Sequence, residues 1–258
     1  MKKLLTSHVW LLTVVLLSAS LVLVSCKKEQ PGTTTPPTSE PQSTTPADPA
    51  ANNAPAPAAE GDMVPLPIEL PPAMFVGTPQ NIKVNNLEKP LGKARPPRLA
   101  PKGVINLAAG KPITSSDENP IIGELSYITD GDKAGSDGSY VELGPMVQHV
   151  TIDLEKVCDI YAVLAWHYHM QARVYFDVIV QVSKDPDFIE ATTIYNNDDD
   201  NSSGMGVGKD MNYIETSEGR LIDAKGVQGR YVRLYSKGNN ANEYNHYVEV
   251  EVFGKPVE

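Results

Sequence analysis

The chain has 258 residues, with 32 acidic and 22 basic side chains and a formal net charge of −10 at pH 7. This acidity argues against nucleic acid as a partner, because binding to a phosphate backbone rests on clustered basic side chains. The sequence shows no internal repeat and no heptad pattern, which excludes solenoids and coiled coils.

Residues 1–25 are predicted to be a signal peptide. Lys2 and Lys3 precede an apolar run from Val9 to Val24, which is short for a permanent spanning helix of about 20 residues. The run ends in Leu23-Val24-Ser25-Cys26, which resembles a bacterial lipobox. The resemblance implies cleavage before Cys26 and a lipid on its sulfur. The chain would then be anchored in the bacterial cell envelope, outside the cytoplasmic membrane, at the outer membrane or cell surface. An ordinary secretory signal or an uncleaved anchor is the alternative.

Residues 26–61 are predicted to be a disordered tether. Pro, Thr, Ala and Ser dominate this stretch, and it has too few apolar side chains to offset the entropy of ordering it. It is therefore expected to act as a spacer that holds a folded domain off a membrane. The other cysteine, Cys158, has no disulfide partner if Cys26 carries lipid. Its apolar neighbours predict a small buried side chain.

Residues 62–103 are predicted to be an extended, proline-rich arm. Seventeen of the 22 prolines lie between residues 27 and 102, which argues against a helix or a central strand. From Asn81 to Gly103 six basic side chains stand against Glu88 alone, whereas residues 104–258 carry 25 acidic and 12 basic side chains. These opposite charges favour an arm that docks on the folded domain. A further stretch of linker is the alternative.

Residues 104–258 are predicted to form one all-β domain, an antiparallel β-sandwich. Apolar and polar residues alternate in VQHVTIDL, VYFDVIVQVS, RYVRLYS and HYVEVEVFG, and turn-rich segments separate these stretches. No segment shows a long helical period. Half-apolar strands of this kind suit two packed sheets.

Six motifs follow one another in this domain. They are NLAAGKPITSS from Asn106, ITDGD from Ile128, VTIDL from Val150, DVIVQVSKDPDF from Asp177, GRYVRLY from Gly229, and VEVEVFG from Val248. The series resembles the F5/8 type C (discoidin) domain of the galactose-binding-like superfamily, and it is similar to family 32 carbohydrate-binding modules. The resemblance covers residues 104–254 and implies a jelly-roll β-sandwich. One departure is SDGSYVELGP, which lacks the tryptophan that the family usually has after its Asp-Gly turn.

The resemblance also implies a structural calcium ion. The implied ligands are the carboxylates of Asp130, Asp132 and Glu249 and the backbone carbonyls of Tyr127, Gly135 and Val248. Calcium takes about six to eight oxygen ligands of this mixed kind, and Gly131 allows the tight turn that aims two carboxylates inward. The alternative is a plain β-turn with solvated acids.

The stretch WHYHMQARVY lies where sugar-binding relatives place side chains that contact sugar hydroxyls. By position, the resemblance implies His167, His169 and Arg173 as ligand contacts and Tyr244 as an aromatic platform. Two alternatives stay open for the histidines: hydrogen bonding inside the sandwich, or a metal site completed by His149 or His246. Trp166 and Tyr168 fall on the opposite strand face and are predicted to be core.

The motifs of common hydrolases are absent from the sequence. It contains neither G-x-S-x-G nor H-E-x-x-H. The expected function is a non-enzymatic, lipid-anchored carbohydrate-binding module stabilised by calcium. A protein-interaction or adhesion module of the cell envelope, without a sugar ligand, is the alternative. Membrane binding through the sandwich loops is disfavoured because those loops are rich in Asp and Asn. Among them, Asp198 to Asp200 form an exposed charge run or a second cation site.

Overall fold

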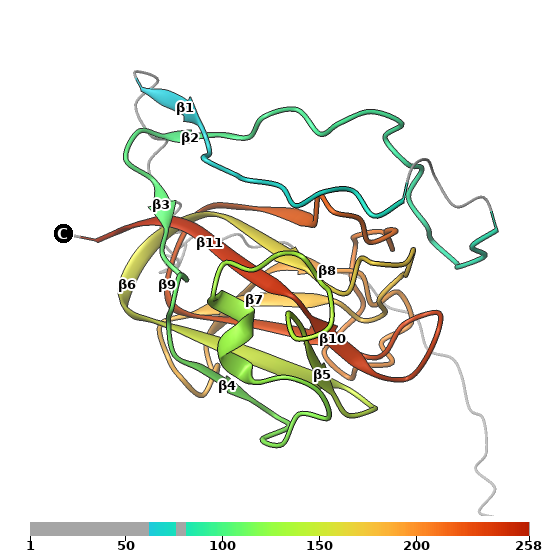
Figure 1. The fold of residues 1–258 in the computed structure, drawn as a ribbon. Helices are drawn as coiled ribbons and strands as arrows, with labels where there is room; N and C mark the ends of the chain where they lie inside the picture. The colour runs from blue at the N-terminus through green and yellow to red at the C-terminus, as the bar shows by residue number, and fades with distance from the viewer. Residues whose placement is uncertain (1–61, 76–80, 258) are drawn as a thin grey trace, which may run out of the picture. The chain divides into compact units, whose positions relative to one another are not determined.

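A computed structural model describes residues 62–75 and 81–257, and its regular elements there are strands apart from one short 3₁₀ helix (Figure 1). The elements are β1 (Met63–Pro65), β2 (Leu99–Pro101), β3 (Ile105–Asn106), β4 (Ile113–Ser115), the 3₁₀ helix η1 (Leu125–Thr129), β5 (Val141–Leu143), β6 (Gln148–Trp166), β7 (Ile179–Ser183), β8 (Ala191–Asn196), β9 (Arg220–Ser236), β10 (Asn245–Tyr247) and β11 (Glu249–Pro256). Within these ranges no helix is long and apolar enough to cross a membrane. The predicted signal peptide, Cys26 and the predicted tether lie outside the described residues.

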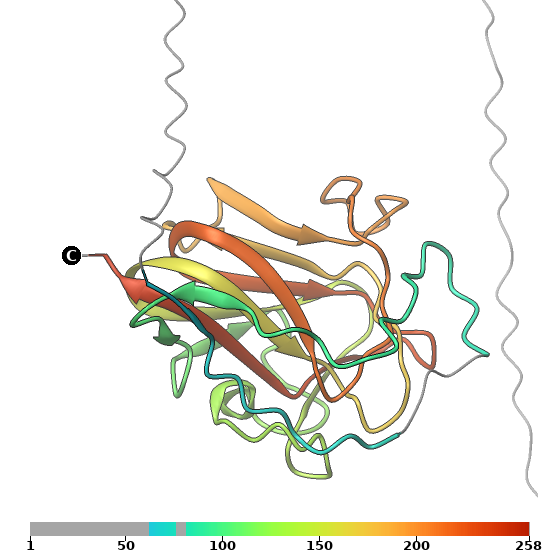
Figure 2. The same ribbon diagram turned by 90° about the horizontal axis from the view of Figure 1, so that it is seen from above.

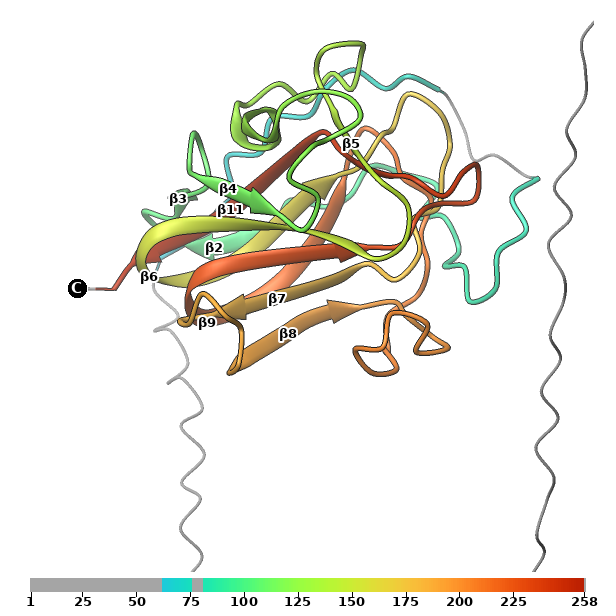
Figure 3. The same ribbon diagram turned by 90° about the horizontal axis from the view of Figure 1, so that it is seen from below.

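One antiparallel sheet folds over on itself to make both layers of the sandwich. Its strands follow the order β3-β11-β6-β9-β7-β8, and β4 pairs with β6 beside this path. The first half of β6 and the second half of β9 lie with β4, β7 and β8, whereas their other halves lie with β3 and β11. Figure 3 shows the wide curve of β6 between the two layers.

The bend in the two long strands has a local cause. The register between β6 and β9 shifts between Asp153 and Cys158, and Glu155 within this interval has a positive φ of 66°. Such shifts are β-bulges, which bend a strand and increase its twist. On β9, a Cβ atom at Gly229 would come 2.2 Å from the Val182 side chain. Glycine is therefore required where β9 passes this close to β7.

The main core lies between the two layers. Alternate strand residues supply it, among them Val150, Ile152 and Leu154 from β6, Val180 and Val182 from β7, and Val250 and Val252 from β11. These are the faces that the period-two alternation predicts. Cys158 is a fully buried free thiol in the same core, as predicted. The predicted all-β antiparallel sandwich is confirmed.

Residues 62–75 and 81–103, the arm, run out and back along one side of the sandwich (Figures 1 and 2). β1 and β2 pair with each other at the end of this path. Leu66 and Ala100 join Trp166, Val248 and Phe253 in a second core cluster. Since Trp166 lies on the side of β6 that faces away from the main core, the arm supplies the apolar cover for this outer face.

Polar contacts also join the arm to the sandwich. The Arg95 guanidinium donates to the carbonyls of Glu218 at 2.8 Å and Gly219 at 2.9 Å. Arg98 pairs with Asp223. Two of the arm's basic side chains are thus directed onto the sandwich surface.

Candidate functional site

Aromatic and charged side chains gather where β5 pairs with β10. Glu142 and His246 are direct neighbours in this antiparallel pair. Tyr140 immediately precedes β5, and the loop that follows β6 contributes Tyr168 and Arg173. We refer to these five residues as the tyrosine–arginine cluster.

The rings of the cluster are held by contacts among themselves. Tyr140 and Tyr168 meet edge to face, with ring centroids 5.1 Å apart. The Arg173 guanidinium lies over the Tyr168 ring, 4.5 Å from its centroid. All three side chains are half-buried, so each also presents part of its surface to solvent. Edge-to-face and cation–π contacts of this kind fix ring orientation in advance of any ligand.

His246 connects the two charged members of the cluster. Its Nε2 atom lies 2.8 Å from Glu142 Oε2 and 3.4 Å from Arg173 Nη1. Burial, reinforced by the positive charge of Arg173, lowers the pKa of His246 to about 3, so the imidazole is neutral at pH 7. A neutral imidazole facing a carboxylate donates its N–H, so His246 holds the Glu142 carboxyl in place. Burial in turn raises the pKa of Glu142, and Arg173 opposes that shift.

His167 and His169 are both fully buried. His167 Nδ1 lies 3.2 Å from Glu215 Oε2, and its ring stacks on Tyr175 with centroids 4.4 Å apart. His169 Nε2 lies 2.8 Å from the Lys133 carbonyl oxygen. Because neither imidazole reaches the surface, the structure places both as hydrogen-bonded interior residues instead of ligand contacts.

The other predicted contacts are divided between the cluster and its surroundings. Arg173 belongs to the cluster, as described above. Tyr244 is half-buried in the loop before β10, and its carbonyl accepts a hydrogen bond of 3.0 Å from Asn239 Nδ2. Trp166 is core, as predicted, whereas Tyr168 is only half-buried: it packs against the main core and also lies beside Arg173.

No histidine belongs to a metal-binding group within residues 62–75 and 81–257. His149 packs against Tyr235 on the paired strand, with ring centroids 5.2 Å apart. His246 is engaged with Glu142. The histidine metal site that the sequence left open is therefore not assembled.

Sequence reasoning missed Tyr140 and Glu142 altogether, because their place depends on a register between segments about a hundred residues apart. Glu142 faces His246 only because β5 pairs with β10. One sequence signal could have found them. Tyr140 and Glu142 are two positions apart, on either side of Val141, in the stretch that departs from the family pattern. Positions two apart on a strand share one face.

The Asp130-Gly131-Asp132 turn meets the start of the last strand. Gly131 has a φ of 90°, and its N–H donates to Glu249 Oε2 at 3.1 Å. Asp130 Oδ1 accepts the Asp132 N–H at 2.8 Å, so the turn closes on itself. The carboxylates of Asp130, Asp132 and Glu249 do not form a group whose ligand atoms all lie within 4.8 Å of one another. The turn is therefore hydrogen-bonded to Glu249, but the three carboxylates are not gathered closely enough in this arrangement to share one ion.

Glu249 itself fits a cation. Its side chain is fully buried, and Oε1 has no hydrogen-bond partner. Burial raises the pKa of Glu249 to about 8, and the negative charges of Glu251 and Asp130 add to this effect. The nearby Lys133 Nζ pairs with Glu251 Oε1 at 2.7 Å. Glu249 is therefore a buried carboxyl whose second oxygen lacks a donor or an ion.

The three predicted carbonyl ligands lie on segments that adjoin the last strand or its neighbours. Tyr127 lies in η1, which contacts β11. Gly135 has a positive φ of 68° and lies beside the His169 ring. Val248 separates β10 from β11, and its N–H donates to the Trp166 carbonyl at 2.8 Å.

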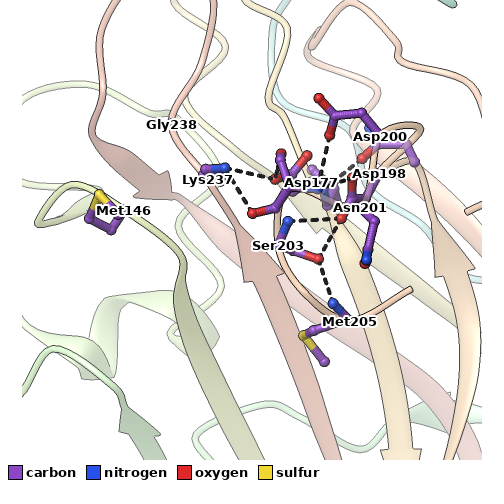
Figure 4. Close-up of polar contacts among 12 residues, drawn as sticks. Met146, Asp177, Asp198, Asp200, Asn201, Ser203, Met205, Lys237 and Gly238 are labelled. Carbon is purple, nitrogen blue, oxygen red and sulfur yellow. Dashed lines mark hydrogen bonds and ion pairs between the residues drawn. The ribbon is translucent and has the colours of Figure 1, made fainter. Parts of the chain in front are cut away.

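A second acidic group is formed by Asp177, which lies just before β7, and two aspartates of the loop after β8. Carboxylate oxygens of Asp177, Asp198 and Asp200 lie within 4.8 Å of one another (Figure 4). Asp198 is fully buried and accepts the Ser202 N–H at 3.0 Å. Asp177 accepts the Ser202 hydroxyl at 2.6 Å, and Lys237 Nζ lies 3.8 Å from it. Asp198 is thus part of the loop's internal hydrogen bonding, not of an exposed charge run.

No family model matches this sequence, and no curated protein matches it. Among solved structures, the chain is similar to a truncated AlyQ with CBM32 and alginate lyase domains, at 19% identity and a TM-score of 0.42. That likeness covers 57% of this chain and 32% of the AlyQ chain, so this chain spans about a third of that protein.

Two further similar structures are isolated modules. CpGH89CBM32-4, produced by Clostridium perfringens, in complex with GlcNAc-α-1,4-galactose, matches at 18% identity and a TM-score of 0.42, over 60% of this chain and 96% of that one. A Streptococcus pneumoniae fucose binding module matches at 19% identity and a TM-score of 0.42, over 59% and 96%. The sugars named for these two structures are ligands of those proteins.

Proposed function

We propose that this chain is a non-enzymatic carbohydrate-binding module, held in the bacterial cell envelope by a lipid on Cys26 and a tether. The observation that supports sugar binding is the tyrosine–arginine cluster. Its partly exposed rings offer an apolar surface for the C–H face of a sugar, while Arg173 and Glu142 offer hydrogen-bond donors and an acceptor for hydroxyls. The anchor rests on the lipobox resemblance of residues 23–26.

The charges of the cluster suit hydroxyl recognition. Arg173 makes no salt bridge with any described carboxylate, and its side chain is half-buried, so part of the side chain stays open to solvent. Glu142 is oriented by the neutral His246 and does not share a proton with it. One cation and one anion, both oriented before a ligand arrives, can donate to and accept from neighbouring hydroxyls of one sugar ring.

A glycan array tests this proposal with the soluble chain that begins at Lys27. The wild-type chain is expected to bind at least one glycan. Tyr168→Ala and Arg173→Gln are each expected to weaken that binding by at least about tenfold, or about 1.4 kcal/mol, because each removes a pre-oriented contact. Tyr231→Ala, a half-buried tyrosine that packs on Phe188, is the matched control and should leave affinity unchanged.

Two results would count against sugar binding at this cluster. Equal glycan affinity of the Tyr168→Ala and Tyr231→Ala chains would show that the tyrosine–arginine cluster does not bind the sugar. Failure to bind any plant, algal or bacterial polysaccharide would favour a protein-interaction or adhesion module of the envelope.

We also propose that a structural calcium ion binds at Glu249. Its support is the buried Glu249 Oε1 atom without a partner, next to the negative charge of Asp130. The remaining ligands would be the carboxylates of Asp130 and Asp132, both of which would have to turn from their own loop toward Glu249, and the carbonyls of Tyr127, Gly135 and Val248. The ion would supply the positive charge that this buried carboxyl lacks.

Calcium removal is expected to lower the thermal unfolding midpoint of the chain. At a free calcium concentration about 100 times the Kd, binding contributes about 2.7 kcal/mol, which corresponds to a shift of roughly 5–10 °C for a domain of this size. Calorimetry with calcium and with EGTA measures the shift. Glu249→Gln should abolish it, whereas Asp177→Asn in the other acidic group should retain it. Identical midpoints with calcium and with EGTA would refute the site.

A further inference from the structure

The outer surface of the arm is unusually apolar. Its exposed large hydrophobic side chains are Met63, Val64, Leu70, Met74, Leu91 and Leu99. They are six of the fourteen such side chains in the described part of the chain, although the arm supplies only 37 of its 191 residues. Exposed large apolar side chains are therefore about three times as frequent per residue in the arm as in the sandwich.

The same surface carries lysines without ion-pair partners. Lys83, Lys89, Lys93 and Lys102 are exposed, and none of them forms a salt bridge within residues 62–75 and 81–257. They differ in this respect from Arg95 and Arg98, which are directed onto the sandwich. The exposed acidic side chains of the arm are Asp62 and Glu69, so the four lysines leave its solvent-facing side chains with a net positive charge.

The two properties coincide in the loop from Lys89 to Lys93. Leu91 is 58% exposed and stands between the two lysines, and the positive φ of Gly92, 67°, turns the chain there. Leu91 also lines a groove of about 590 Å³ together with Met74. An apolar side chain flanked by lysines matches the boundary between the acyl chains and the anionic headgroups of a bilayer.

The negative charge of the sandwich determines which side of the protein faces an anionic membrane. Residues 104–258 carry 25 acidic and 12 basic side chains. Near an anionic membrane, such a molecule is attracted through its basic side and repelled through its acidic side, so the arm faces the lipid.

We propose that the arm is a contact surface for an anionic lipid bilayer. A bilayer fits better than a protein partner because the exposed apolar side chains are spread singly along an extended segment, between lysines. Protein interfaces gather their apolar residues into a packed central patch. The proposal does not depend on sugar binding, which uses other elements.

Vesicle sedimentation tests the proposal with the chain that begins at Lys27, so that neither the Val9–Val24 run nor a lipid on Cys26 contributes. The chain is expected to bind vesicles of equal parts phosphatidylglycerol and phosphatidylcholine at low salt. It should not bind phosphatidylcholine alone, and about 0.5 M salt should release it. Lys89→Glu/Lys93→Glu should weaken binding by at least about tenfold, and Leu91→Ser by at least about threefold.

The matched control is Lys209→Glu/Lys225→Glu, which changes the net charge equally at two exposed lysines of the sandwich. Unchanged binding of this control supports a local contact. Equal loss in both double variants would show general repulsion and overturn the proposal, and so would a lack of binding to the anionic vesicles. Thermal unfolding of each variant verifies that it is folded.

Discussion

Replacing Leu66 with alanine is expected to lower the free energy of unfolding by about 2–4 kcal/mol, although Leu66 lies in a proline-rich segment. Its side chain is buried against Trp166 and Phe253 on the outer face of the sheet. Truncation leaves a cavity between the arm and that face, and the extended arm has few neighbours that can fill it. Removing residues 62–103 should cost more, because the Trp166 ring would then lose its apolar cover.

Urea unfolding of Leu66→Ala and Leu70→Ala measures the effect with a built-in control. Leu70 belongs to the same segment but is 49% exposed, so its truncation should change stability by less than about 0.5 kcal/mol. Equal midpoints for the two variants would mean that the arm is not part of the folded core. Proteolysis gives an independent comparison, since cleavage near Lys93 should be much slower than cleavage near Lys27.

Replacing Glu215 with alanine is expected to destabilise the protein by about 2–4 kcal/mol, because it removes the nearest hydrogen-bond partner of a buried histidine and leaves a cavity. Glu215 and His167 are both fully buried, and His167 Nδ1 lies 3.2 Å from Glu215 Oε2. Tyr175 and Tyr247 pack against the imidazole, and the Tyr213 hydroxyl, 3.4 Å from His167 Nδ1, is its other polar neighbour. The Glu215 N–H also holds the Arg173 carbonyl at 2.7 Å, which ties the pair to the loop of the cluster.

Two further variants distinguish loss of the His167–Glu215 contact from a general loss of packing as the cause of the destabilisation. Glu118→Ala, at an exposed position, should leave stability unchanged. The double variant His167→Phe/Glu215→Leu should recover much of the loss, because replacing both hydrogen-bonded partners by apolar groups of similar size leaves neither one unsatisfied. If Glu215→Ala unfolds at the same urea concentration as Glu118→Ala, the pair contributes nothing.

The strands of the main core were predictable from local alternation. Val150, Ile152 and Leu154 face inward as their period-two pattern requires. The length of β6 was not predictable, because the strand continues to Trp166 through a bulge at Glu155. A bulge interrupts the alternation from which a strand is recognised.

The last strand shows where alternation misleads. Glu249 and Glu251 stand opposite Val250 and Val252, which suggests a solvent-facing edge for the two acids. Both acids are buried, and Lys133 Nζ pairs with Glu251. Which polar side chains become buried depends on contacts far along the chain, and no local pattern records those contacts.

The candidate site, too, was predictable from the sequence only in part. The resemblance pointed to the segment after Trp166, and Arg173 of that segment lies in the tyrosine–arginine cluster. Contact between Arg173 and a sugar stays a prediction. The two histidines of that segment turn inward because their rings find partners in Glu215 and the Lys133 carbonyl. The side chains that complete the cluster, Glu142 and His246, meet through strand pairing, which is a property of the whole fold.

Nuclear magnetic resonance of tyrosine ring-labelled protein tests the sugar site most directly, during titration with the tightest-binding glycan of the array. We expect the ring signals of Tyr140 and Tyr168 to shift in proportion to binding, while those of Tyr161 and Tyr231 stay unchanged. Shifts confined to other tyrosines, with Tyr140 and Tyr168 unmoved at saturation, would contradict it.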